Sequence, residues 1–293
     1  MRKVIIDPIC TPEEARQRFA GLRPDYQWAA SQGLNFVRGE DFCCRDTKGK
    51  LVAMLLTDMF SEEEQAHHWE IYKDIKGSAD NRPEIFGTGA RQPRIRKTDG
   101  LLSKRVGVPT EVAKAVGGAA VVIGPYRYKN PAPGVVHCDL TKETKENPAR
   151  YLETIKIGEE ITRIFREVLP EEYIIQMAYI NTVPERFKMP GTAYSSACAL
   201  RDIPTAFHID EFDIREATGC ITACGEYEGQ EFTMPEFGLA LDLQPSDILF
   251  CDVHRTHGNL PRRSGHRVSQ VWFVRRGMHE CQRYGAVPLH LDF

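Results

Sequence analysis

Residues 206–274 read AFHIDEFDIREATGCITACGEYEGQEFTMPEFGLALDLQPSDILFCDVHRTHGNLPRRSGHRVSQVWFV. The segment contains an H-x-D pair, His208 and Asp210, then His257 at 49 positions after His208, and Arg267 ten positions further on. On a β-strand, residues i and i+2 point to the same side, so the H-x-D pair can reach one metal ion. Two histidines and one carboxylate on one face of an octahedron are the usual ligands of a non-heme Fe(II), which keeps positions open for oxygen and a co-substrate. The spacing therefore predicts an iron site on a β framework.

The sequence around these residues predicts short antiparallel strands. Apolar and polar residues alternate, or form short apolar runs, and turn residues separate the runs. The candidate strands are 220–224, 231–234, 239–243 and 248–250. Such strands at regular intervals are typical of a barrel or jelly roll. A last strand over 267–273 puts Arg267 and Ser269 on one face, and an inward guanidinium can grip a carboxylate with two hydrogen bonds.

Three motifs in this segment resemble those of a known superfamily. GEYEGQEFTMP, LDLQPSDILF, and HGN with Ser269 after nine intervening residues are similar to the double-stranded β-helix of Fe(II)/2-oxoglutarate dioxygenases. Within it, the order HxD, H and R with a ten-residue step resembles the TET/JBP group, which oxidises 5-methylpyrimidines in nucleic acid. One departure is Ser246, where the family usually has Gly before Asp.

The resemblance implies roles for individual residues. His208, Asp210 and His257 would be the catalytic iron ligands, Arg267 would anchor the far carboxylate of 2-oxoglutarate, and Ser269 would assist by hydrogen bonding. Molecular oxygen would take the remaining iron position, and a substrate C–H bond would be hydroxylated. A base in duplex DNA would have to be flipped into the pocket and stacked. Candidate walls for that pocket are Phe207, Phe212 and Tyr194.

Each central residue also has a plainer interpretation. A lone H-x-D histidine is more often a hydrogen-bonded structural residue, His254 competes with His257, and Arg267 can instead lie on the surface of its strand. We favour His257 because it precedes Gly-Asn and stands ten residues before Arg267. A second H-x-D, His137 with Asp139, has no alternating strands after it and is the weaker candidate.

The chain length predicts one main core with an added layer. We expect an α+β fold in which a double-stranded β-helix (jelly-roll) core is flanked by helices and carries an N-terminal α/β extension. The extension and a basic loop would take residues 1–105, and the dioxygenase core 106–293, as one structural unit. Residues 194–200 are the candidate first barrel strand, and apolar residues at helical spacing predict a helix over 147–169.

The first hundred residues carry clear local signals. Thr11-Pro12-Glu13-Glu14 and Ser61-Glu62-Glu63-Glu64 predict helix starts. Residues 42–45 and 51–56 flank Asp-Thr-Lys-Gly and predict a hairpin. His67 and His68 point about 100° apart on a helix. We therefore expect two surface histidines rather than a metal pair.

Residues 81–105 are basic and rich in Gly and Pro, which indicates a long loop. Its candidate nucleic-acid contacts are Arg91, Arg94, Arg96 and Lys97, and the alternative is a solvated loop. The net charge of −3 gives no global sign of nucleic-acid binding. The basic cluster Arg255, Arg262 and Arg263 offers further local support.

The composition predicts an intracellular protein. Nine cysteines without framework spacing fit reduced thiols in a reducing compartment, cytoplasm or nucleus, which also suits Fe(II). The N-terminal apolar run is too short for a signal peptide, no run approaches a membrane span, and no obligate protein partner is indicated.

Three functions remain open on the sequence. The first is a TET/JBP-like dioxygenase acting on methylated pyrimidine in DNA, with 5-methylcytosine as first choice. The second is a dioxygenase that hydroxylates a small molecule or a protein side chain, which the acidic net charge favours. The third is a metal-free β-helix binding module, which would leave His208, Asp210 and His257 without a purpose.

Overall fold

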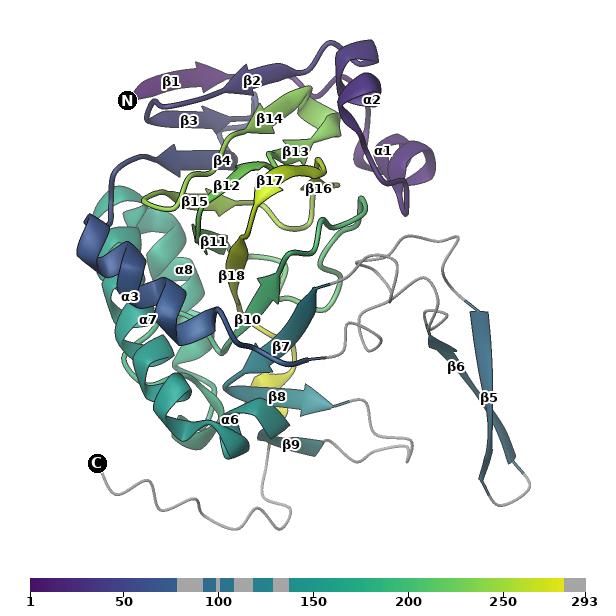
Figure 1. Cartoon of the computed structure of the whole chain (residues 1–293), viewed down its shortest axis with the longest axis vertical. Coiled ribbons are helices and arrows are strands. Elements are labelled where there is room, and N and C mark those ends of the chain that lie inside the picture. The colour runs from purple at the N-terminus through teal and green to yellow at the C-terminus, as the bar shows by residue number, and fades with distance from the viewer. Residues whose placement is uncertain (78–91, 99–100, 108–117, 129–136, 282–293) are drawn as a thin grey trace. The chain divides into compact units, whose positions relative to one another are not determined.

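The computed structural model describes residues 1–77, 92–98, 101–107, 118–128 and 137–281 (Figure 1). The chain divides into two compact units. Unit 1 comprises Met1–Val121, Cys198–Glu211 and Thr218–Val271, and unit 2 comprises Val122–Ala197, Phe212–Ala217 and Trp272–Phe293.

Two sheets form the framework. The eight-stranded sheet has the order β1-β3-β4-β15-β11-β18-β10-β7, and the four-stranded sheet has the order β16-β13-β14-β2. The large sheet consists of β1 (Arg2–Ile5), β3 (Phe42–Arg45), β4 (Leu51–Leu56), β7 (Ala119–Ile123), β10 (Ser196–Arg201), β11 (Gly219–Cys224), β15 (Ile248–Cys251) and β18 (Val268–Phe273). The small sheet consists of β2 (Asn35–Val37), β13 (Phe232–Met234), β14 (Leu239–Leu241) and β16 (Gly258–Asn259).

The main core of unit 1 lies between these sheets. Phe42, Leu55 and Leu249 come from the large sheet, and they pack in one buried cluster with Phe232 and Leu241 of the small sheet. The double-stranded β-helix fold class is confirmed, and the predicted barrel strands correspond to β10, β11, β13, β14, β15 and β18.

The N-terminal residues complete both sheets. The predicted hairpin is confirmed as β3 and β4, and β4 pairs antiparallel with β15. β2 pairs parallel with β14. These strands lie within unit 1 together with the core strands, and the expected boundary at residue 105 falls inside β6 (Leu101–Gly107). The division into an extension and a core stays a prediction.

The basic segment contains a strand pair where we expected a loop. β5 (Gln92–Thr98) pairs antiparallel with β6 (Leu101–Gly107). The missed signal is the Asp-Gly dipeptide at 99–100, which favours a two-residue hairpin connection. The remaining strand pairs are β12 (Tyr227–Gly229) with β17 (Arg262–Gly265), and β8 (Pro125–Tyr128) with β9 (His137–Leu140).

The helix starts of unit 1 follow their capping sequences. Thr11 caps α1 (Pro12–Phe19) and Ser61 caps α3 (Glu62–Tyr72), each with a complete capping box. α2 (Tyr26–Ser31) begins after Asp25. The expectation of two surface histidines was wrong for His68, which is buried and meets the ring of Phe60 edge-on at 4.8 Å. His68 shares the buried face of α3 with Tyr72, four residues on.

Unit 2 is largely helical. Its helices are α6 (Lys142–Glu146), α7 (Pro148–Val168) and α8 (Pro170–Ile180), with short 3-10 turns η3 (Glu185–Phe187) and η5 (Met278–Glu280). The predicted helix over 147–169 is confirmed as α7. Cys138 and Cys281 form a disulfide with their Cα atoms 5.7 Å apart, so the expectation that all nine cysteines are thiols was wrong for this pair. The other seven are free. Among the described residues, no helix has the length and apolarity needed to cross a bilayer.

Candidate metal centre

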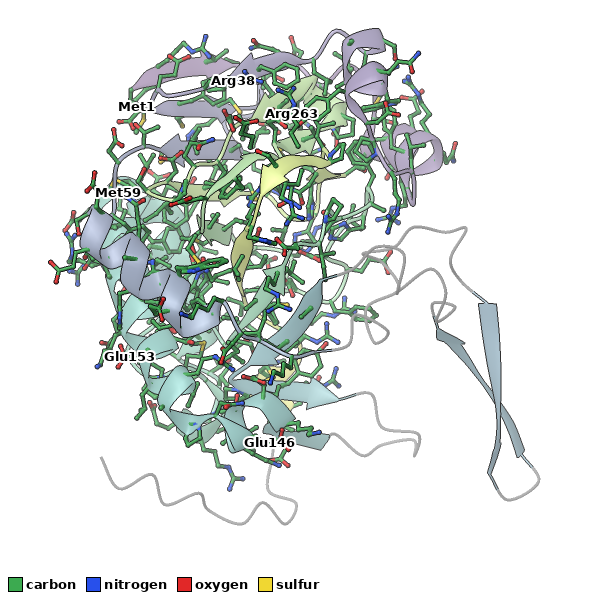
Figure 2. The ribbon with its side chains drawn as sticks, in the orientation of Figure 1. Met1, Arg38, Met59, Glu146, Glu153 and Arg263 are labelled. Atoms are coloured by element: carbon green, nitrogen blue, oxygen red, sulfur yellow. A yellow bond between two sulfur atoms is a disulfide. The ribbon has the colours of Figure 1, made fainter. Side chains whose placement is uncertain are left out.

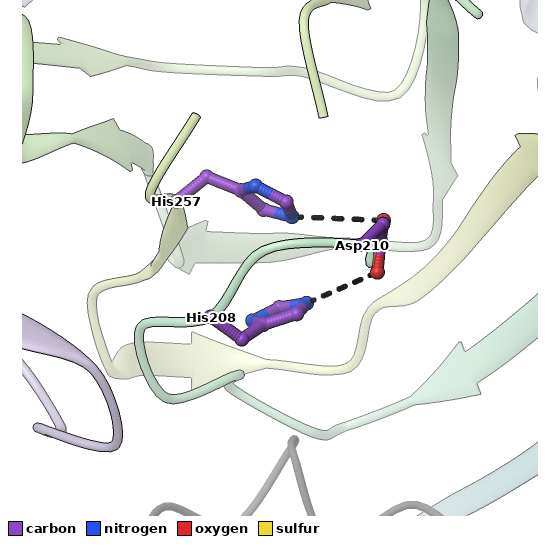
Figure 3. Close-up of side chains that lie close together, drawn as sticks. All are labelled: His208, Asp210 and His257. Carbon is purple, nitrogen blue, oxygen red and sulfur yellow. Dashed lines mark ion pairs between the residues drawn. The ribbon is translucent and has the colours of Figure 1, made fainter. Parts of the chain in front are cut away.

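Three predicted side chains converge in unit 1. His208 Nε2 lies 3.7 Å from Asp210 Oδ1, and His257 Nε2 lies 3.8 Å from Asp210 Oδ2 (Figure 3). One potential ligand atom from each residue lies within 4.8 Å of the other two, so a single ion can be reached by all three. His254 does not join this group, since it faces Asp252 instead.

The H-x-D pair does not lie on a regular strand, contrary to our expectation. His208 forms an isolated antiparallel bridge with His257, with hydrogen bonds of 2.9 and 3.0 Å between their backbones. Asp210 follows in irregular chain, where its backbone N–H donates to Val253 O at 3.0 Å. The ring centroids of the two histidines lie 4.4 Å apart. The backbone pairing of His208 with His257, and not the alternation of side chains along a strand, therefore brings the candidate ligands together.

Each histidine is oriented by a carbonyl two residues before it. His208 Nδ1 lies 2.8 Å from Ala206 O, and His257 Nδ1 lies 2.9 Å from Arg255 O. A carbonyl can only accept, so both Nδ1 atoms carry a proton, and Nε2, on the side of Asp210, is the nitrogen of each ring left to bind a metal. This is the usual arrangement for metal-binding histidines, whose second nitrogen is held by a carbonyl or carboxylate.

Burial keeps the second histidine in its metal-binding form. Burial first, and then the neighbouring His208, lower the pKa of His257 to about 4. The imidazole is therefore neutral near pH 7, as a metal ligand must be. Its ring also stacks on Phe232 at 5.3 Å. Asp210 keeps 30% of its side chain exposed, so the carboxylate side of the group is the open one.

Arg267 is buried just before β18, as expected for an inward-facing residue. Only 1% of it is exposed, its Nη1 donates to Gln230 O at 2.6 Å, and its guanidinium lies 4.9 Å over the ring of Tyr227. Gln230 O also accepts from Asn259 Nδ2 at 3.2 Å, which ties Arg267 to the strand that follows His257.

The guanidinium has donor capacity left over. Arg267 Nε is buried without a hydrogen-bond partner, and so is the side-chain nitrogen of Gln230. An unpaired buried cation is costly, and a carboxylate supplies what a guanidinium fork lacks. The donor set therefore fits one end of a dicarboxylate such as 2-oxoglutarate. Ser269 is half-buried in β18, and its predicted hydrogen bond to 2-oxoglutarate stays a prediction.

Gln230 was missed by the sequence reasoning. Its backbone has φ of 59°, a left-handed conformation that is unusual for a residue with a side chain. That conformation places the carbonyl that holds Arg267. The available signal was the Glu228-Gly229 turn before the strand β13, in a motif that we had used only for the family resemblance.

Two of the three candidate pocket walls are core residues. Phe207 is buried and packs on Phe19 and Trp28 in unit 1. Tyr194 is buried and stacks on Phe165 in unit 2. Phe212 is 40% exposed and remains a candidate.

The predicted DNA contacts are only partly described. Arg91 lies outside the described residues, and Arg94, Arg96 and Lys97 lie in β5, for which the backbone alone is described. In the basic cluster, Arg263 (labelled in Figure 2) is exposed. Its guanidinium lies 3.9 Å from the centre of the Tyr26 ring, while Arg262 pairs with Asp202.

The second H-x-D is only partly described, because the side chain of His137 lies outside the described part of the structure. Asp139 pairs with Lys145, a neighbour along the chain, and belongs to β9. The only group of three or more such ligands in the described part of the chain is His208, Asp210 and His257.

Comparison with known proteins follows the same segment. Residues 126–276 match the Tet_JBP family, the oxygenase domain of the 2OGFeDO superfamily. Thymine dioxygenase JBP1-A of Trypanosoma cruzi (strain CL Brener) is 26% identical over 166 residues, which are 54% of this chain and 20% of the relative. The bifunctional helicase and thymine dioxygenase JBP2 of the same organism is 26% identical over 205 residues, 66% of this chain and 18% of the relative. The chain thus spans a small part of the length of these relatives.

A solved structure shares the fold. NgTET1 in complex with 5mC DNA matches with a TM-score of 0.55 and 14% identity, covering 92% of this chain and 93% of that one. The family match spans just over half of the chain and includes every residue of the candidate centre. This chain therefore belongs to the Tet_JBP family of oxygenase domains.

Proposed function

We propose that this chain is an Fe(II)- and 2-oxoglutarate-dependent dioxygenase that hydroxylates the 5-methyl group of a pyrimidine in DNA. The observation that carries the proposal is the convergence of His208, Asp210 and His257, with both Nε2 atoms aimed at the Asp210 carboxylate. The superfamily to which the chain belongs uses Fe(II) and 2-oxoglutarate.

Two groups of residues would act in the proposed site, one binding the metal and one binding 2-oxoglutarate. His208, Asp210 and His257 would hold Fe(II), which when bound supplies the oxygen chemistry that hydroxylates a C–H bond. Arg267 would hold the far carboxylate of 2-oxoglutarate through the donors that Gln230 O leaves unpaired. The protein's own contribution is positioning, since a substrate methyl group must be held near the iron.

The choice of a methylated pyrimidine in DNA rests on the relatives. JBP1-A and JBP2 are named thymine dioxygenases, and the structurally similar NgTET1 was solved with 5mC DNA. Arg91, Arg94, Arg96 and Lys97 are our candidates for phosphate contacts. We place the activity in a reducing intracellular compartment, where DNA lies and Fe(II) persists. The seven free cysteines fit such a compartment, whereas the Cys138–Cys281 disulfide does not.

The deciding experiment supplies Fe(II), 2-oxoglutarate and oxygen with three duplexes. One contains 5-methylcytosine, one contains thymine with no methylated cytosine, and one carries uracil in place of thymine and no methylated cytosine. We expect succinate release and a hydroxymethyl nucleoside, detected by mass spectrometry, from a duplex that contains a 5-methylpyrimidine, and neither product from the uracil duplex. The absence of a hydroxymethyl nucleoside from all three duplexes, with 2-oxoglutarate consumed on a small molecule or a peptide instead, would contradict the DNA assignment. His208→Ala is the inactive control.

A further inference from the structure

The loop that joins β15 to β16, residues 252–257, supplies backbone carbonyls that hold two of the three candidate ligands. Val253 O accepts the hydrogen bond from the backbone of Asp210 at 3.0 Å. Arg255 O accepts from His257 Nδ1 at 2.9 Å. Apart from the bridge at His257, the loop belongs to no sheet or helix, so no regular backbone ladder holds these two carbonyls in place.

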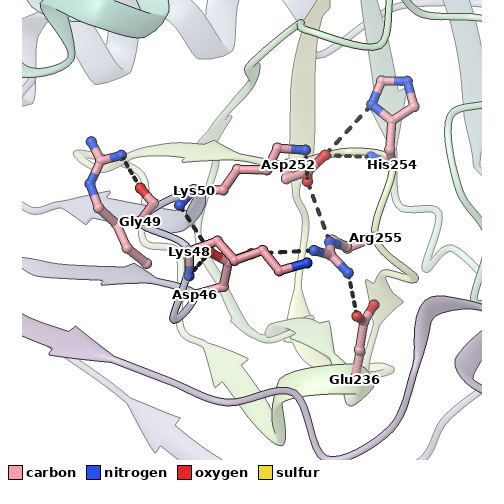
Figure 4. A network of polar contacts seen from close by, with 9 residues as sticks. Asp46, Lys48, Gly49, Lys50, Glu236, Asp252, His254 and Arg255 are labelled. Atoms are coloured by element: carbon pink, nitrogen blue, oxygen red, sulfur yellow. Dashed lines mark hydrogen bonds and ion pairs between the residues drawn. The ribbon is translucent and has the colours of Figure 1, made fainter.

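A buried ion network supplies that constraint through the side chain of Arg255 (Figure 4). Its Nη1 lies 2.6 Å from Glu236 Oε1, its Nη2 lies 3.5 Å from Asp46 Oδ2, and its Nε lies 3.4 Å from Asp252 Oδ2. Glu236 is fully buried, and Asp46 and Asp252 are 7% and 5% exposed. Each of the three guanidinium nitrogens therefore faces a carboxylate, and two of these carboxylates, Asp46 and Glu236, come from outside the loop.

The network is anchored outside the loop. Asp46 Oδ1 accepts from the backbone of Lys48 and of Lys50, each at 2.9 Å, which fixes the β3–β4 turn. Lys50 Nζ in turn reaches Asp252 Oδ2 at 2.6 Å. Glu236 belongs to η4 (Pro235–Phe237), between β13 and β14. The loop is thus clamped between a turn of the large sheet and a turn of the small one.

The main effect of such a network is to fix the geometry of its residues, not to stabilise the fold. Burying ion pairs costs desolvation energy that offsets much of their attraction, so they contribute little net stability, but they do demand one arrangement. Here that arrangement includes Arg255 O, and a metal-bound histidine depends on the partner of its second nitrogen for its orientation.

We propose that Arg255, held by Glu236, is a positioning residue for metal binding, which sets the orientation of His257 through its own carbonyl. This inference rests on the proposed function, because it concerns the same three ligands. It concerns a residue that we had first interpreted as part of a basic surface cluster.

The test measures metal binding without turnover. Co(II) is added to the metal-free full chain, and both its dissociation constant and its visible absorption spectrum are recorded for wild type, Arg255→Met, Arg255→Lys and Glu236→Gln. The control is Arg163→Met, which removes ion pairs with Glu160 and Glu167 on the exposed face of α7. The unfolding temperature of each metal-free variant is measured in parallel.

We expect Arg255→Met to weaken Co(II) binding by about 10- to 100-fold and to change the spectrum. Arg255→Lys should recover part of the loss, since an ammonium can face Glu236 but cannot reach three carboxylates at once. Should Arg255→Met fail to fold, the near-isosteric Glu236→Gln carries the test and should weaken binding in the same direction. The control should match wild type.

Unchanged affinity and spectrum in a folded Arg255 or Glu236 variant would overturn the positioning role and leave the proposed function standing. An equal loss in Arg163→Met would also overturn it, because the effect would then be general. A wild-type chain that does not bind Co(II) would overturn the proposed function itself, and the inference with it.

Discussion

The guanidinium of Arg267 uses only part of its hydrogen-bonding capacity within the protein, so it can bind a carboxylate. One guanidinium nitrogen is held by Gln230 O, while Nε has no partner in the buried interior. Replacing it by lysine keeps the charge but loses the fork, so we expect the half-saturating 2-oxoglutarate concentration to rise about 10-fold, and about 100-fold for Arg267→Ala. Succinate release at varied 2-oxoglutarate measures this. Arg163→Ala, at an exposed site on α7, is the control. An unchanged requirement in Arg267→Ala would remove the assigned role.

His68 makes the stability of unit 1 dependent on pH. Burial first, and then the neighbouring His67, lower its pKa to about 4 in the folded chain, against about 6.5 when unfolded. Between these values the unfolded chain binds more protons, so stability is complete above pH 6.5 and falls as the pH drops toward 4. The loss from this residue is roughly 3 kcal/mol over that window. Urea unfolding at pH 7 and pH 4 should show it in wild type.

The matched variants assign that loss to one side chain. His68→Gln should lose roughly 3 kcal/mol less than wild type between the two pH values, since glutamine does not titrate there. His67→Gln, at the adjacent position on α3, should behave nearly as wild type does. Parallel pH profiles for wild type and His68→Gln would show that the buried imidazole is not the source.

At the scale of the element, α7 contains a glycine where a helix would normally favour alanine. A Cβ at Gly158 would lie 2.8 Å from a ring carbon of the fully buried Trp272 and 3.0 Å from Thr192. Removing a helix glycine usually contributes about 1 kcal/mol, but forced overpacking costs about 1–3 kcal/mol. We expect Gly158→Ala to lower the free energy of unfolding by about 1 kcal/mol. In a Trp272→Leu background the same change should be neutral or stabilising, and a loss there would contradict the steric explanation.

What the sequence could predict at this scale depended on how local the signal was. The capping boxes at Thr11 and Ser61 and the helix α7 were predictable because their signals lie within a few residues. The convergence of His208, Asp210 and His257 was predictable from their spacing, but their backbone was not, because the bridge between His208 and His257 is a tertiary contact.

The exceptions have tertiary causes. Arg255 looked like part of a surface cluster, and its burial depends on carboxylates that lie up to 209 positions away in the chain, as Asp46 does. His68 was expected on the surface because adjacent helical histidines point in different directions and make a poor metal pair. Packing against Phe60 decides which face of α3 is buried. Neither outcome can be deduced from a window of sequence.

At the scale of the whole molecule, the net charge of −3 means that the proposed DNA binding must depend on a local group of cations. The candidates with described backbone are Arg94, Arg96 and Lys97 on β5. Each phosphate contact releases condensed counterions, so the logarithm of the binding constant falls with the logarithm of salt by about 0.9 per contact on duplex DNA. Replacing all three by alanine should therefore reduce that slope by about 2–3 and weaken binding about equally on methylated and unmethylated duplexes.

Fluorescence anisotropy with labelled duplexes over a range of salt concentrations measures this slope. Lys142→Ala removes a cation whose side chain is 84% exposed on α6, and it should leave the slope near that of wild type. The comparison separates contact from bulk charge, because a uniform electrostatic effect would appear in the control in proportion to the charge removed. A triple variant with the wild-type slope would place the phosphate contacts elsewhere on the chain, and it would leave the proposal for the metal site standing.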